Sequence, residues 1–219
     1  MKKILWAVLI LLALMVGFIP ITYLINGVSE GYLALKSKEI LTSKPWWVFL
    51  YTHIISGGIA ILIGWIQFSK KLLQNRLNLH RNIGKIYIVS SLICSISGFY
   101  VGIYATGNWV AKLGFMTATC LYFYVSLKGY LSIRKLQVTE HQNYMTYSYA
   151  LCLSAVSLRL AVPLSYLLGF DYIVAYTFIA WFAWIPNLTI AYFENKNRPV
   201  FLSYSKSMKS LSGQSNFAQ

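Results

Sequence analysis

Six apolar runs, each long enough to cross a lipid bilayer, constrain the fold of this chain more than any other feature. A spanning helix needs about 20 predominantly apolar residues. Within hydrocarbon the backbone must satisfy its own hydrogen bonds, which favours helices over strands. The sequence therefore predicts an all-α, polytopic transmembrane helical bundle of about six spans, at residues 4–25, 46–68, 86–105, 109–131, 144–168 and 172–193.

The composition indicates a surface that lies in lipid. Hydrophobic residues make up 58% of the chain and charged residues only 11%, against about 25% charged in an ordinary soluble domain. The lipid bilayer is thus the expected partner. We expect one transmembrane domain over residues 1–200 and a flexible cytoplasmic tail over 201–219. The net charge of +14 does not predict a nucleic-acid partner, because the basic residues lie between apolar runs, where they orient helices.

The distribution of Lys and Arg predicts the topology. With the N-terminus inside, 14 basic residues fall on the cytoplasmic side and four on the outer side. Under the positive-inside rule this bias places both termini in the cytoplasm and the protein in the cell (inner) membrane. The outer four are Lys36, Lys38, Lys44 and Lys112.

The inner connection at residues 69–85 mixes leucines with basic residues. Such a pattern is typical of a short amphipathic stretch on the membrane surface, and a solvated connector is the alternative.

A stripe of small residues follows His53 in the second apolar run. His53, Gly57, Ala60 and Gly64 recur at the spacing of one helical face. Such a face leaves room for a close neighbour, which is either another helix or a planar macrocycle ligated by the imidazole.

A longer stripe on the fifth run is predicted to face the interior of the bundle, because His and Arg lie against lipid only at a cost. Its members are His141, Met145, Ser148, Cys152, Ala155 and Arg159.

Arg159 is the one charged residue expected deep in the membrane, and all five acidic residues lie in loops or at boundaries. The guanidinium either extends to the surface, bonds to helix carbonyls or hydroxyls, or binds an anion such as a haem propionate, a lipid phosphate or a substrate carboxylate. Helical rise places His53 at a similar depth, so a shared site is expected.

Two further histidines begin helices on the cytoplasmic side. His80, followed by Arg81, starts the third span, and His141 starts the fifth. Helix N-termini favour anions. The two imidazoles are either interfacial, structural residues or ligands that bracket a metal, with haem iron as the candidate for His53, His80 and His141.

The sixth run contains a break. Pro186 removes a backbone donor, and Asn187 follows it, so polar groups become available at one point. The break serves either helix packing or ligand binding. Hydrolase chemistry is not indicated, because no Ser or Cys nucleophile is paired by signature with a histidine.

Four segments carry a resemblance to a known family: HIISGGIAILIGWIQF, LHRNIGKIYI, HQNYMTYSYALCLSAVSLRL and IAWFAWIPNLTIAY. The chain resembles the membrane-protein family catalogued as domain of unknown function 2306 over roughly residues 47–193. Where that family often has Trp and Arg, this chain has Tyr144 and Tyr147. The resemblance implies a multi-span helical membrane protein and supplies no activity. The family's recurring positions fall on His53, Gly64 and Gln67; His80, Arg81 and Gly84; His141, Met145 and Arg159; and Trp184, Pro186 and Asn187.

These observations lead to two functional hypotheses. The first is a membrane protein that binds haem b or a related redox cofactor. The second is a non-enzymatic binder or transporter of a hydrophobic or anionic small molecule, namely a lipid, a quinone or a small anion. The residues expected at the binding site in either case are His53, His80, Arg81, His141, Met145, Arg159 and Asn187.

Overall fold

The computed structural model describes residues 2–27, 33 and 35–198, and every regular element in that part of the chain is a helix. The tail expected at 201–219 lies outside the described residues. In chain order the elements are α1 (Lys2–Asn26), α3 (Lys38–Thr42), α4 (Lys44–Gly64), the 3-10 helix η1 (Trp65–Phe68), α5 (Lys70–Asn75), α6 (Leu77–Ile103), α7 (Trp109–Arg134), α8 (Val138–Cys152), α9 (Ser154–Leu167), α10 (Tyr172–Phe182) and α11 (Ile185–Lys196).

The described helices include six that are long and apolar enough to cross a membrane, which confirms the all-α transmembrane class and the six spans. They are Trp6–Asn26, Lys44–Phe68, Leu77–Ile103, Trp109–Arg134, Val138–Leu167 and Tyr172–Lys196. The protein is therefore a multi-pass membrane protein.

The third span begins nine residues earlier than its apolar run predicts. Helix α6 starts at Leu77, and the short helix α5 precedes it, so the connection expected at 69–85 is almost wholly helical. Hydropathy marks only the lipid-embedded part of a helix, whereas the backbone hydrogen bonds of α6 continue through the polar residues beyond it. His80, which was expected to begin the third span, lies in the first turn of α6.

The fifth and sixth spans are each divided into two helices. The first break falls at Leu153, between α8 and α9. The second falls at Ala183 and Trp184, and Pro186 stands in the first turn of α11, where its missing N–H leaves no hydrogen bond unmade. The break in the sixth span was thus expected from Pro186, whereas Pro163 lies inside α9 without dividing it.

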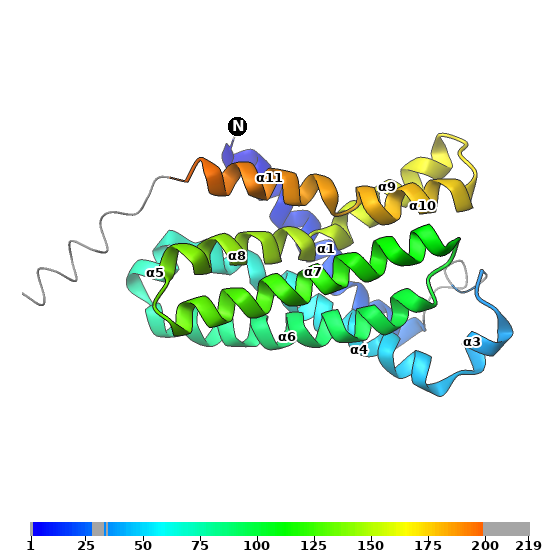
Figure 1. Cartoon of the computed structure of the whole chain (residues 1–219), viewed down its shortest axis with the longest axis horizontal. Coiled ribbons are helices and arrows are strands. Elements are labelled where there is room, and N and C mark those ends of the chain that lie inside the picture. Colours follow the sequence, from blue (N-terminus) through cyan, green and yellow to red (C-terminus); the bar gives the residue numbers. More distant parts are fainter. Residues whose placement is uncertain (1, 28–32, 34, 199–219) are drawn as a thin grey trace, which may run out of the picture.

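Four helices enclose the centre of the molecule. Helix α4 packs along α6, α6 along α7 and α7 along α8, while α8 also contacts α4. Helix α1 packs against α4, α10 against α7, and α11 against α8 (Figure 1). Small residues permit these approaches: a Cβ on Gly58 of α4 would lie 2.6 Å from Pro20 Cγ of α1.

The bundle has two ends that differ in their connections (Figure 1). We call them the α5 end, which also holds the turn between α7 and α8, and the α3 end, which holds the turn between α6 and α7. His80 and His141, at the starts of α6 and α8, therefore lie at the α5 end.

Candidate functional site

The structure separates the seven predicted site residues into three groups. His80, Arg81, His141 and Met145 lie at the α5 end, on the first turns of α6 and α8. His53 and Arg159 form a second group nearer the α3 end, and Asn187 belongs to the two helix breaks.

His141 is held by the backbone of a neighbouring helix. Its Nδ1 lies 2.8 Å from the carbonyl oxygen of Gly129 on α7. A carbonyl only accepts, so Nδ1 is the protonated nitrogen of the neutral ring and Nε2 carries the lone pair. Met145 fills the space beside the same glycine, because a Cβ on Gly129 would lie 2.7 Å from Met145 Sδ. The absence of a side chain at Gly129 thus lets α8 approach α7.

His80 and Gln67 present buried nitrogens that lack partners. Within the described part of the chain, neither Nδ1 of His80 nor Nε2 of Gln67 has a hydrogen-bond partner. The Gln67 carboxamide lies over Gly84, with Oε1 3.3 Å from where a Cβ would stand. Gly84 follows His80 by one helical turn, roughly 6 Å along α6. The two unpartnered nitrogens therefore occupy one small region of the α5 end.

The same region contains the second histidine of that end. His141 acts electrostatically on the His80 imidazole, as does Arg81. Gln67, His80 and His141 thus bring together groups from η1, α6 and α8. We call this set the head-group site. Arg81 is exposed at its edge.

The three histidines do not converge on one centre. His53 precedes Gln67 by 14 residues on the second span, which corresponds to roughly 20 Å. Among the residues described, no cluster of three or more His, Cys, Asp or Glu side chains that would hold a metal ion occurs. Of the histidines expected at haem iron, only His80 and His141 lie near each other.

His53 packs inside the bundle against α6. Its Nδ1 lies 2.8 Å from the carbonyl oxygen of Cys94 and 3.4 Å from the Cys94 sulfur. A Cβ on Gly98 would lie 2.6 Å from the same nitrogen. The imidazole therefore occupies the space that Gly98 leaves open, and its tautomer is set in the same way as that of His141.

Arg159 lies near His53, as their expected depths predict. Its Nη1 donates to the carbonyl oxygen of Ala155 at 3.1 Å, and its charge acts on the His53 imidazole. The backbone carbonyl is one of the partners expected for this guanidinium. The two residues thus share a region of the bundle interior.

The stripe on the fifth span faces inward, as predicted. Ser148 and Cys152 are 0% and 7% exposed. Ser148 Oγ lies 2.9 Å from the Tyr87 hydroxyl and 2.7 Å from Ser126 Oγ, so one serine joins α6, α7 and α8. Such hydrogen bonds hold transmembrane helices together in the absence of a hydrophobic driving force.

Neighbouring side chains fill the small-residue face of α4. A Cβ on Gly57 would meet Cys94 Sγ at 3.1 Å, and one on Gly64 would meet Tyr149 carbons at 2.4 and 2.5 Å. This arrangement favours the helix-packing interpretation of the stripe over the macrocycle.

Asn187 joins the two helix breaks. Its Nδ2 donates to the carbonyl oxygens of Ala150 and Ala183, and to Ser157 Oγ. These carbonyls lie where α8 and α10 end, so the amide satisfies backbone groups near the breaks. This geometry favours the packing interpretation of Asn187.

Sequence reasoning did not assign a binding role to Gln67. A usable signal was present, because Gln67 continues the face of His53 and Gly64 by one further turn. Gln67 was noted among the family's recurring positions, yet a neutral amide at a membrane boundary indicates a ligand less strongly than a histidine does. Ser126, which bonds to Ser148, and the buried Tyr122 were missed for the same reason.

A family model described as "Predicted membrane protein (DUF2306)" matches residues 50–194, which is more than half of the chain. No curated protein and no solved structure matches the chain.

Proposed function

The chain belongs to the predicted membrane protein family DUF2306, and we propose that it binds a small molecule whose head carries hydrogen-bond acceptors in the head-group site. One observation carries this proposal: Gln67 Nε2 and His80 Nδ1 are buried without partners in the same region. The activity is binding or transport, and it requires no bond to be made or broken by the protein.

The chemistry of the ligand follows from the groups that would meet it. Leaving a buried donor unpaired costs about 1–3 kcal/mol, so a ligand that accepts from the Gln67 amide offsets that cost. A quinone carbonyl, a carboxylate and a phosphate all supply such an acceptor. The lipids, quinones and small anions expected from the sequence share this feature.

The surroundings of the head-group site favour a ligand that carries hydrogen-bond acceptors. Arg81 and Lys85 lie exposed on the first turns of α6, and α5 begins with Lys70 and Lys71. These residues belong to the basic set from which the positive-inside rule predicts that the α5 end faces the cytoplasm.

Titration of the purified protein with three head-group probes tests the proposal: a benzoquinone without a tail, inorganic phosphate and acetate. Isothermal calorimetry in lipid nanodiscs should show saturable binding of at least one probe. The double variant Gln67→Leu/His80→Phe should lose that binding, because it removes both unpartnered nitrogens. The matched control Gln74→Leu changes an exposed glutamine of α5 and should bind as the unmodified chain does. Equal binding by the double variant, or binding of none of the probes, would contradict the proposal.

A second candidate function is haem b binding, and a specific observation favours it. His141 directs Nδ1 to the carbonyl oxygen of Gly129 at 2.8 Å, an arrangement that orients a ligating imidazole and leaves Nε2 for the metal. His80 and His141 would hold such a group, with Arg81 toward a propionate. Expression with haem supply should then give a Soret band that His141→Ala abolishes, and a colourless protein would exclude this candidate.

A further inference from the structure

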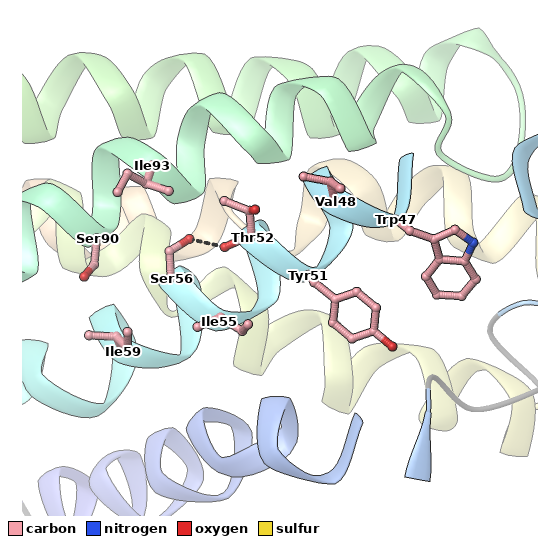
Figure 2. A pocket seen from close by; sticks show the side chains of 9 residues that line it. All are labelled: Trp47, Val48, Tyr51, Thr52, Ile55, Ser56, Ile59, Ser90 and Ile93. Atoms are coloured by element: carbon pink, nitrogen blue, oxygen red, sulfur yellow. Dashed lines mark hydrogen bonds between the residues drawn. The ribbon is translucent and has the colours of Figure 1, made fainter. Parts of the chain in front are cut away.

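A groove of about 620 Å³ runs between α4 and α6 on the outer surface of the bundle. Small-molecule sites typically have volumes of about 300–1,000 Å³. Figure 2 shows side chains from both helices around it, with Trp47 and Tyr51 toward one end and Ile59 toward the other. Its walls and floor include Val48, Ile55, Ile59 and Ile93, together with Ser56 and Ser90.

The groove combines apolar walls with hydroxyl groups. Ile55, Ile59 and Ile93 are 37%, 40% and 42% exposed. Ser56 donates to the carbonyl oxygen of Thr52, as Figure 2 shows. Ser90 is 7% exposed and also lines the groove. The groove thus offers two serine side chains beside its apolar walls.

The groove and the head-group site lie on the same pair of helices. At helical spacing, the face of Ile59 continues through Ile63 and Ile66 toward Gln67, and the face of Ser90 continues through Ile86 and Ile83 toward His80. From Trp47 to Gln67 the second span rises roughly 30 Å, which is about the thickness of the hydrocarbon core. We call this boundary between α4 and α6 the seam; the groove lies along part of it, and the head-group site lies toward its α5 end.

We propose that the groove holds the tail of an isoprenoid quinone whose ring lies in the head-group site. This inference rests on the proposed function and names the class of its ligand. A quinone carbonyl accepts from the Gln67 amide without bringing a charge to be desolvated. The acyl chain of a bilayer lipid crosses one leaflet, about half of the roughly 30 Å core, whereas a long isoprenoid chain extends along the whole seam.

Two radiolabelled probes with the same quinone ring test this assignment, one without a tail and one with a tail of several isoprene units. Scintillation-proximity binding to the protein in nanodiscs should show the tailed probe binding at least tenfold more tightly. Ile59→Trp fills the groove. It should abolish the tail's advantage, meaning the tighter binding of the tailed probe, and leave the affinity of the tailless probe unchanged. The control Ile96→Trp changes an exposed residue of α6 outside the groove and should keep the advantage.

The outcomes separate the two proposals. If both probes bind with equal affinity, or if Ile59→Trp retains the tail's advantage, the tail assignment is wrong and the head-group site stands. If neither probe binds, the quinone assignment is wrong, and the phosphate and acetate titrations decide whether the head-group site stands. An unlabelled fatty acid and an unlabelled tailed quinone are compared as competitors of the tailed probe. If the two displace it with equal potency, the groove is a site for acyl chains and the quinone assignment is overturned.

Discussion

The contact between Gly64 and two tyrosines provides a sharp test of the packing between α4, α6 and α8. A Cβ at Gly64 would lie 2.4 and 2.5 Å from carbons of the Tyr149 ring and 2.9 Å from Tyr87 Cε2. Non-bonded carbons prefer separations of about 3.5–4.0 Å, so Gly64→Ala introduces overlaps of roughly 1 Å. Tyr87 and Tyr149 are 1% and 4% exposed and have little room to move.

Overpacking of this kind costs about 1–3 kcal/mol. For a chain of this length that loss lowers the melting temperature by about 2–12 °C. A thermal-shift assay on the protein in detergent measures it directly. Gly57→Ala is the matched control on the same face of α4, because its Cβ would meet only Cys94 Sγ, at 3.1 Å.

We expect Gly64→Ala to melt several degrees below Gly57→Ala. Equal melting temperatures for the two variants would refute the reasoning, since they would show that the tyrosines do not close over Gly64 and that the face is open.

Three further predictions concern residues away from the head-group site. Burial, and to a smaller extent Lys112, lowers the pKa of Lys36 to about 8 from 10.5. The unfolded chain therefore binds this proton more strongly between about pH 8 and 10.5. Thermal melts should show the stability of the unmodified chain rising with pH across that window relative to Lys36→Gln. The same pH dependence of stability in both proteins would contradict this. Asn187→Leu removes donors to backbone carbonyls near both helix breaks and should cost about 1–3 kcal/mol in thermal unfolding while leaving probe binding intact, and an unchanged melting temperature would disprove the packing role. Arg159→Lys and Arg159→Gln should have equal melting temperatures, because a backbone carbonyl accepts from either side chain. A lower melting temperature for the Gln variant alone would instead indicate a bound anion.

The sequence predicts the spans well because hydrophobic length is a direct requirement of the bilayer. It places the inward face of the fifth span correctly as well, since Ser148 and Cys152 are buried. Hydropathy alone misses the start of α6 at Leu77, because a helix that continues past the lipid leaves no hydropathy signal, whereas the expectation that His80 begins this helix is three residues from the observed start. The break at Leu153 carries neither proline nor glycine and is likewise invisible to the pattern.

The candidate site is only partly predictable for a similar reason. Helical spacing brings His53 and Arg159 to one depth, and the starts of α6 and α8 bring His80 and His141 to one end. The role of Gln67 depends on how η1 turns its amide over Gly84, which is a tertiary contact that no spacing in the sequence expresses. Asn187 was selected for its place beside Pro186, yet its partners across the breaks give it a structural role.

The orientation of the bundle stays a prediction that follows from the distribution of basic residues. Cysteine labelling of intact cells checks it: a single cysteine placed at Lys38, near the α3 end, should react with an impermeant reagent. One placed at Gln74, near the α5 end, should be protected. The reverse pattern would place the head-group site on the outer side.

The composition of the natively extracted protein tests the central claim most directly. Extraction into nanodiscs without added detergent, followed by mass analysis, should recover an acceptor-bearing small molecule at about one per chain. The Gln67→Leu/His80→Phe variant should lose that molecule, and the Gln74→Leu control should retain it. Equal ligand content in the double variant and the unmodified chain would contradict the assignment of Gln67 and His80 to the binding site.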